Sequence, residues 1–154
     1  MKRLFTVAIV VAAAALAGCG GEERVARDEF SDRLASIDER GGELWGQLEQ
    51  RAQSLETDQP LPADIEQALE ALIEFQEQTV AELETLTPPE AAQEPVEMLI
   101  DALRKRTESF KAAIAAGHFT DQGSDRVTQA GEQIDEAFEQ LRAEGFLAAD
   151  EHEE

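Results

Sequence analysis

The sequence predicts an all-α protein, an up-down-up-down four-helix bundle, from three observations. Apolar residues recur every three or four positions through almost the whole chain, which is the period of an amphipathic helix. No strand pattern is evident. Segments rich in proline and glycine divide the chain into four amphipathic stretches joined by short connections. A single long coiled coil, the alternative architecture, is disfavoured because the prolines return the chain on itself.

The first helix is expected over residues 25–56. Its inward positions form a 4-3 repeat of apolar side chains: Phe30, Leu34, Ile37, Leu44, Leu48 and Leu55. Gly41 and Gly42 each lower the helix propensity by about 1 kcal/mol relative to Ala. A continuous helix and a helix broken at this pair, which would give a five-piece bundle, therefore both stay open. Residues 57–62 (TDQPLP) end the segment.

The second helix is expected to begin near Pro62, which suits a first helical turn. Its inward positions are Ile65, Leu69, Leu72, Gln76, Val80, Leu83 and Leu86, widened by Ile73 and Phe75. The residues TPPE follow at 87–90. We expect Thr87 to cap the next helix, with Pro88 at its first position and Glu90 closing a capping box.

The third segment contains Pro95, which lies too deep for a first-turn proline and should break or kink the helix. We therefore expect a short helical turn at 88–93 and a main helix over 95–116, ended by Gly117. Its inward positions are Val96, Leu99, Ile100, Leu103, Phe110 and Ile114.

The fourth helix follows an expected loop over residues 117–124, with Ser124 or Asp121 as its cap. Its inward positions are Val127, Ile134, Phe138 and Leu141, with Gly131 on the same seam. Gly145 is expected to end this helix, and residues 146–147 to fold back over the bundle.

The composition limits the partners of the chain. The 154 residues fit a single domain and carry a formal net charge of −21. Such a chain repels the phosphates of nucleic acids and of anionic lipids, so no nucleic-acid partner is expected. Aromatic residues are scarce, with seven Phe, one Trp and no Tyr, which argues against a surface that stacks on sugars or bases.

The N-terminus has the layout of a secretory signal peptide. Lys2 and Arg3 precede a thirteen-residue stretch without charge, which is shorter than the roughly 20 residues of a spanning helix. The stretch ends in Leu-Ala-Gly-Cys at positions 16–19, which resembles the lipobox of bacterial lipoproteins at all four positions. The resemblance implies cleavage before Cys19, a diacylglycerol on its sulfur and a fatty acid such as palmitate on its amine. The residue after Cys19 is Gly20, and the absence of Asp there implies sorting to the outer membrane in a cell with two membranes.

The predicted organisation follows from this resemblance. It comprises a signal peptide (1–18), a lipidated Cys19 with a short flexible tether (19–24), a helical bundle domain (25–147) and an acidic tail (148–154). The protein would face outside the cytoplasm, held on the cell membrane or outer membrane by its lipid. Residues 83–90 also resemble a segment of small helical lipoproteins of GC-rich bacteria, which implies no activity.

Residues that carry catalysis or hold metals are not arranged for either task. The two histidines, His118 and His152, fall in a loop and in the tail, and no acid falls on an inward stripe. Carboxylate-bridged metal centres in bundles need inward Glu and Glu-x-x-His pairs. The lipobox resemblance implies that the Cys19 thiol carries a lipid and is not free for catalysis, and no serine lies in a Gly-x-Ser-x-Gly turn. The sequence therefore predicts no enzyme, no metal and no cofactor.

Four residues are candidates for contact with a partner: Trp45, Arg104, Lys105 and Arg106. The basic run at 104–106 is either a docking patch for an acidic partner or lipid head group, or a set of ion pairs along the helix with Asp101 and Glu108. Trp45 is either an exposed aromatic anchor or a side chain half-buried at the edge of its helix.

Polar residues and glycines interrupt the inward stripes near the middle of the helices. Arg51, Gln76 and either Arg106 or Thr107 would form a polar layer around a ligand, or else lie at the stripe edges with their polar ends in water. The glycines on the seams, Gly41 and Gly131, would permit close helix approach or else leave a cleft.

The sequence thus predicts a non-catalytic, lipid-anchored interaction module of the cell envelope, with an envelope protein as its partner. The alternative is a binding protein for a small cation or apolar ligand at the bundle surface or in a cleft. A cavity of roughly 300 Å³ or more would favour this alternative.

Overall fold

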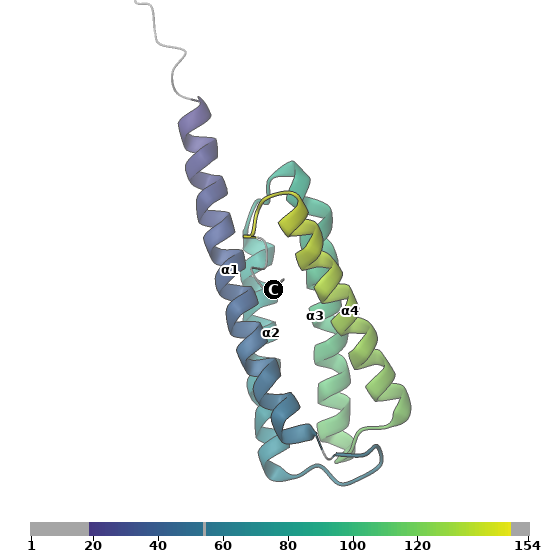
Figure 1. Ribbon diagram of the computed structural model, residues 1–154. Coiled ribbons are helices and arrows are strands. Elements are labelled where there is room, and N and C mark those ends of the chain that lie inside the picture. The colour runs from purple at the N-terminus through teal and green to yellow at the C-terminus, as the bar shows by residue number, and fades with distance from the viewer. Residues whose placement is uncertain (1–18, 54, 149–154) are drawn as a thin grey trace, which may run out of the picture.

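The computed structural model describes residues 19–53 and 55–148, which form four helices (Figure 1). The helices are α1 (Cys19–Ala52), α2 (Ala63–Thr85), α3 (Glu90–Ala116) and α4 (Asp121–Ala143). Each runs antiparallel to the one before it, and the close backbone contacts join α1 to α2, α2 to α3 and α3 to α4. The prediction of an all-α up-down-up-down bundle is confirmed. Positions 16–18 of the lipobox and residues 149–154 of the acidic tail lie outside the described residues.

Helix α1 is continuous through the glycine pair, which resolves the alternative left open by the sequence. A Cβ on Gly41 would lie 3.4 Å from the ring of Phe75, so the missing side chain lets this buried α2 ring approach the α1 backbone. The helix already begins at Cys19 and includes residues 20–23, which were expected to be a flexible tether. Its N-terminal turns extend past the other three helices (Figure 1).

The prediction that Thr87 caps the third helix is wrong. Helix α3 begins at Glu90, and Pro89 is the N-cap residue, with φ −52° and ψ 151° and no side-chain hydrogen bond. The reason is the second proline, because a residue that precedes proline is driven out of the helical region. This restriction applies to Thr87 and also to Pro88, so neither residue adopts helical geometry.

Pro95 does not break α3, since one helix runs from Glu90 to Ala116 in place of the expected short turn at 88–93 and main helix over 95–116. Proline removes one backbone hydrogen bond, the bond to the carbonyl four residues earlier. Pro95 is buried, and so are Ala92 and Val96 on the same face. We attribute the continuity to the packing of this face against the core, which holds the first turns in place.

Helices α3 and α4 end at the predicted glycines, whereas the cap of α4 is neither Asp121 nor Ser124 but the residue before Asp121. Gly117 (φ 75°) ends α3 in the left-handed conformation that glycine adopts most readily. Gly145 has the same φ and follows the last turn of α4. Thr120 is the N-cap of α4, and its hydroxyl accepts a hydrogen bond of 3.0 Å from the Gly123 amide.

The core consists of two apolar clusters, one at each end of the bundle. One is built around Phe30, Leu34, Leu99 and Phe138, and the other around Leu48, Leu69, Leu72 and Phe110. Every inward leucine of α2 and α3 except Leu86 is buried, as the stripes predict. None of the helices in residues 19–53 and 55–148 is long and apolar enough to cross a membrane.

Candidate functional site

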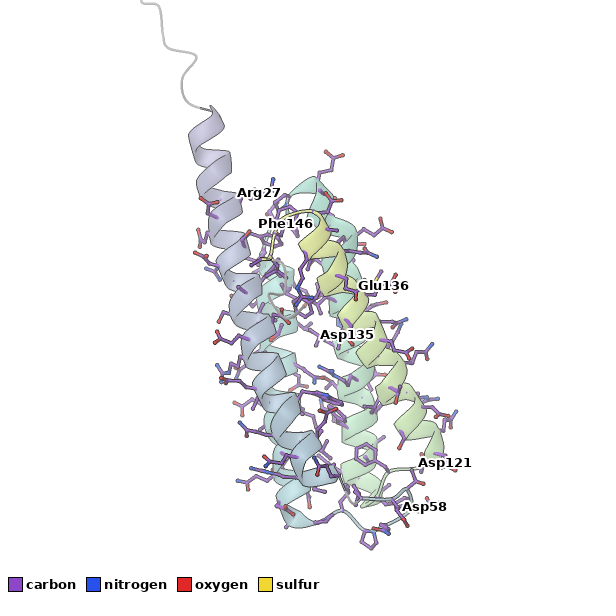
Figure 2. The ribbon with its side chains drawn as sticks, in the orientation of Figure 1. Arg27, Asp58, Asp121, Asp135, Glu136 and Phe146 are labelled. Carbon is purple, nitrogen blue, oxygen red and sulfur yellow. The ribbon has the colours of Figure 1, made fainter. Side chains whose placement is uncertain are left out.

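Helices α1 and α4 are the first and last of the bundle, and contacts at both ends of the bundle join the segments that contain them. At one end the ring of Phe146 meets that of Phe30 edge-on at 5.6 Å, and the Arg27 guanidinium lies 4.5 Å from the Phe146 ring centre (Figure 2). This confirms that the chain folds back after Gly145. Near the same end, Arg142 pairs with Asp38 across the two helices at 2.7 Å.

The opposite end is closed by loops. The amide of Asp58 donates to the carbonyl of Phe119 at 2.8 Å, and the amide of Leu61 donates to the carbonyl of Gly117 at 2.7 Å. These two bonds join the α1–α2 connection to the α3–α4 connection.

Between the two closed ends lies a groove of about 420 Å³, which we call the α1–α4 groove. Its α1 wall is formed by Ile37, Asp38, Gly41, Gly42, Trp45 and Glu49, and its α4 wall by Val127, Thr128, Gly131, Glu132, Ile134, Asp135 and Phe138. Its floor consists of Phe75 from α2 and of Leu99, Leu103 and Arg106 from α3. The floor is therefore apolar except for one guanidinium.

Glycines keep this groove open. A Cβ placed on Gly42 or on Gly131 would meet no atom within 4 Å beyond its own helix. Larger side chains at these positions would project into the space between α1 and α4. Of the two possibilities left open by the seam glycines, Gly131 leaves a cleft, and Gly41 permits the close approach of Phe75.

The groove floor contains a buried polar layer where the two apolar clusters meet. Gln76 is fully buried, and Arg106 and Thr107 are 8% and 6% exposed. The Gln76 amide lies 2.9 Å from the Thr107 hydroxyl. With its oxygen turned toward Arg106, the amide accepts from Nε and Nη2 of Arg106 at 3.1 and 3.3 Å while its nitrogen donates to Thr107. In the opposite orientation the amide N–H groups of Gln76 would face the N–H groups of Arg106, and neither group could accept. We therefore assign the oxygen of Gln76 to the side of Arg106.

The predicted polar layer is thus present, but Arg51 does not belong to it. Arg51 is exposed and donates to the carbonyl of Asp64 at 3.1 Å. The aromatic side of the layer is supplied by Trp45, whose ring lies 5.1 Å from the Arg106 guanidinium and stacks on Phe110 at 6.5 Å. Trp45 is half-buried at the edge of α1, the second of the two placements considered for it.

Burial lowers the pKa of Arg106 to about 10, and the charge of Asp135 opposes this shift. The guanidinium therefore remains protonated at neutral pH. No carboxylate among the described residues lies within 4 Å of its nitrogens. Within residues 19–53 and 55–148, Arg106 is thus a buried cation with no carboxylate in direct contact, and Asp135 acts on it from a greater distance.

The three residues of the basic run point to different places, so they do not form one patch. Arg104 pairs with Glu84 of α2, and Lys105 donates to Gln133 of α4 at 3.4 Å. Arg106 turns into the core. The expected pairs along α3 itself are replaced by pairs between helices, and Lys111 likewise contacts Glu77 of α2.

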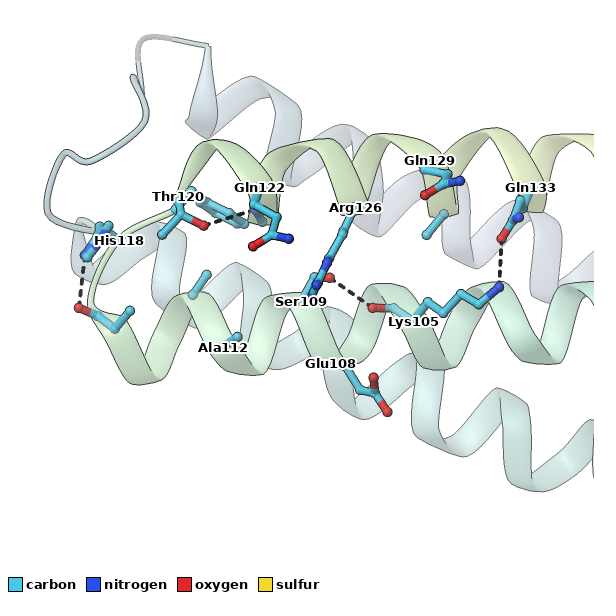
Figure 3. A pocket seen from close by; sticks show the side chains of 15 residues that line it. Lys105, Glu108, Ser109, Ala112, His118, Thr120, Gln122, Arg126, Gln129 and Gln133 are labelled. Carbon is cyan, nitrogen blue, oxygen red and sulfur yellow. Dashed lines mark hydrogen bonds between the residues drawn. The ribbon is translucent and has the colours of Figure 1, made fainter.

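A second hollow, of about 490 Å³, lies on the outer side of α3 and α4 (Figure 3). Its polar side chains include Lys105, Arg126 and Gln129, which are exposed, and Glu108 lies beside them. Exposed charges remain hydrated and bind ligands weakly, because water and salt screen them. The buried polar side chain of this hollow, Ser109, donates to the carbonyl of Lys105 at 3.1 Å, so the hollow has no buried charge like that of Arg106 in the α1–α4 groove.

Within residues 19–53 and 55–148, no group of three or more His, Cys, Asp or Glu side chains is arranged to hold a metal ion. His118 lies in the α3–α4 connection, 3.7 Å from a carboxylate oxygen of Asp58. Comparison of the chain with protein families, with curated proteins and with solved structures finds no match.

Proposed function

We propose that this protein is a lipid-anchored, non-catalytic binding protein of the cell envelope that holds an apolar ligand in the α1–α4 groove. The groove carries this proposal. Its volume of about 420 Å³ falls in the range of ligand sites, roughly 300–1,000 Å³, and such sites are mostly apolar with a few placed polar groups. The residues at positions 16–19 support the anchor by their resemblance to a lipobox.

The anchor is tested by substituting Cys19→Ser in cells fed labelled palmitate. We expect the label to enter the wild-type chain and to be lost from the variant, which should also remain uncleaved at this site. Palmitate that still entered the Ser variant would overturn the lipid anchor.

The groove is tested by placing a photo-crosslinking residue at Asp135 or at Glu136 in intact cells. Both positions are exposed acids on α4, but Asp135 lies on the side facing α1 and Glu136 on the side away from it (Figure 2). We expect an adduct from position 135 that position 136 does not give. Gly131→Phe should fill the groove and abolish the adduct, whereas Gly46→Phe, at an exposed glycine outside the groove, should not.

Mass spectrometry of the adduct separates the two ligand classes. A small added mass identifies an apolar ligand. A covalent band of protein size, lost with Gly131→Phe, would instead identify the envelope protein partner that the sequence predicts. Equal adducts from positions 135 and 136 would overturn the groove as the binding site.

A further inference from the structure

We propose that the ligand of the α1–α4 groove is an amphiphilic carboxylate, whose apolar body lies on the groove floor and whose head group pairs with Arg106. This inference rests on the proposed function, because it names the ligand class of the same site. It starts from the one cation in the groove lining and from what surrounds it.

Arg106 still has hydrogen-bonding capacity inside the groove. A guanidinium has five N–H donors in a planar fork. Gln76 accepts from Nε and Nη2, and Trp45 covers one face of the plane. Two N–H groups are used in this way, so the edge formed by Nη1 and Nη2 keeps donors for a further acceptor.

A carboxylate is the acceptor that suits this edge. A buried charge is costly unless a counter-charge and hydrogen bonds compensate it, and no carboxylate of the described residues is within ion-pair distance of Arg106. Two carboxylate oxygens match two guanidinium donors in a bidentate pair, which is among the strongest hydrogen-bonded contacts in proteins.

The acids at the groove rim determine what else the ligand must contain. Glu49, Glu132 and Asp135 are exposed, so water and salt weaken their fields, although Asp135 still favours the charged form of Arg106. Arg106 itself is buried in surroundings of lower dielectric. The fourth rim acid, Asp38, is already paired with Arg142. A small hydrophilic anion would be repelled by this rim and would gain nothing from the apolar floor. A ligand with an apolar body gains from burial on Leu99, Leu103 and Phe75, which offsets the repulsion.

The chain carries its own reporter for this test, because Trp45 is its one tryptophan and lines the groove. We would titrate the full chain carrying Cys19→Ser, which has no acyl chains of its own, and follow Trp45 fluorescence at physiological salt. Three probes share one tail and differ in the head group: decanoate, decanol and decyltrimethylammonium. Decanoate and decyltrimethylammonium are used below their micelle concentrations, and decanol below its solubility limit.

We expect decanoate to bind about tenfold or more tightly than the other two probes, as a charge-assisted pair requires. Arg106→Met should abolish this preference and leave decanoate no tighter than decanol. Arg106→Lys, which retains the charge without the fork, should retain part of the preference. Gly131→Phe should abolish binding of all three probes, and Gly46→Phe should abolish none.

Each other outcome overturns the inference. Equal binding of decanoate and decanol would leave the groove as an apolar site without head-group selection, and the proposed function would stand. Tighter binding of the cationic probe would mean that the rim acids select the ligand. If none of the probes binds saturably, both the carboxylate ligand and the proposed binding of an apolar ligand are overturned. An envelope protein would then remain as the partner of the groove. Circular dichroism checks that the variants fold. If Arg106→Met does not fold, the ranking of the three probes on the Cys19→Ser chain still decides whether the groove selects a carboxylate.

Discussion

At the scale of single residues, the polar layer on the groove floor has the strictest requirements. Gln76 gives its oxygen to Arg106 and its nitrogen to Thr107, so one amide satisfies two buried neighbours. A buried donor that loses its acceptor costs about 1–3 kcal/mol, more than the hydrogen bond contributes when formed. The three side chains should therefore respond to substitution as one unit.

Gln76→Leu should lower the free energy of unfolding by about 1–3 kcal/mol, because it leaves Nε and Nη2 of Arg106 buried without an acceptor. The double variant Gln76→Leu with Arg106→Met should recover most of that loss, since an apolar replacement of the whole buried polar group is often neutral or stabilising. Urea midpoints of the two single variants and the double variant measure the coupling. If the losses in the free energy of unfolding of the two single variants add up in the double variant, Gln76 and Arg106 contribute independently.

The sequence indicated this layer only as one of two possibilities, for a physical reason. The spacing of a polar residue shows that it falls on the inward face of its helix. The spacing does not show whether the side chain lies at the buried centre of that face or at its exposed edge. Arg51 gave the same signal as Gln76 and Arg106, yet it is exposed. The difference depends on the neighbouring helices, which the local pattern does not contain.

At the scale of the helices, the glycines have opposite roles. Gly131 lies inside α4, where glycine costs about 0.5–1 kcal/mol relative to Ala, and an added methyl group would meet no atom within 4 Å beyond its own helix. Gly117 has a φ of 75°, which side chains rarely adopt. Helix propensity therefore governs the first position, and backbone strain governs the second.

Gly131→Ala should raise the free energy of unfolding by about 0.5–1 kcal/mol, and Gly117→Ala should lower it. Thermal melts of the two variants beside the wild-type chain measure the signs. A loss of stability in Gly131→Ala would mean that α1 lies closer to α4 in solution than the groove allows.

The observed helix caps and buried positions predict the order in which three substitutions lower the free energy of unfolding. Thr87→Ala should change the free energy of unfolding by no more than about 0.5 kcal/mol, because Thr87 is exposed and Pro89 holds the N-cap position. Thr120→Ala removes an observed capping bond and should cost about 1 kcal/mol. Leu99→Ala, at a fully buried position, should cost about 2–5 kcal/mol. Denaturant midpoints that placed Thr87 above Thr120 would contradict the observed caps.

The sequence predicted the helices and their inward faces well, because burial of apolar stripes depends on spacing alone. It predicted the helix ends less well. Thr87 has the chemistry of a cap, but the proline after Pro88 keeps the chain extended for two more residues. Pro95 has the chemistry of a break, but packing of its buried face retained the helix. In both places, a neighbour changed the outcome of a local rule.

At the scale of the whole molecule, electrostatic self-repulsion opposes the compact state. The formal net charge is −21. Most of the ion pairs between helices, such as Arg104 with Glu84, are about half exposed, and the pair of Arg142 with Asp38 is partly buried. Exposed pairs contribute little, about 0–1 kcal/mol each. Long-range repulsion among unpaired carboxylates is the larger electrostatic effect, and salt screens it.

Raising the salt concentration from about 0.01 M to about 0.5 M should therefore raise the melting temperature, because the Debye length falls from about 30 Å to a few Å. Potassium chloride avoids specific binding of divalent ions to the acidic surface. A melting temperature that fell with salt would mean that the ion pairs between helices outweigh the repulsion.

The groove is also a property of the whole molecule, and the stripes alone do not predict it. They show which face of each helix points inward, but they do not determine how closely the first and last helices approach. That distance depends on Gly42 and Gly131, on the ring of Phe75 beside Gly41, and on the contacts that join the two ends. The sequence identified the seam glycines and left the cleft as one of two outcomes.

The unbroken course of α1 determines where the groove would lie above a bilayer. From Cys19 to Ile37, where the groove begins, the helix rises by about 27 Å at 1.5 Å per residue. If Cys19 carries a lipid, the binding site would lie up to this distance from the membrane surface when α1 stands upright, and nearer to the surface when the helix tilts. A ligand leaving the bilayer would have to cross that distance through water or be delivered by a carrier.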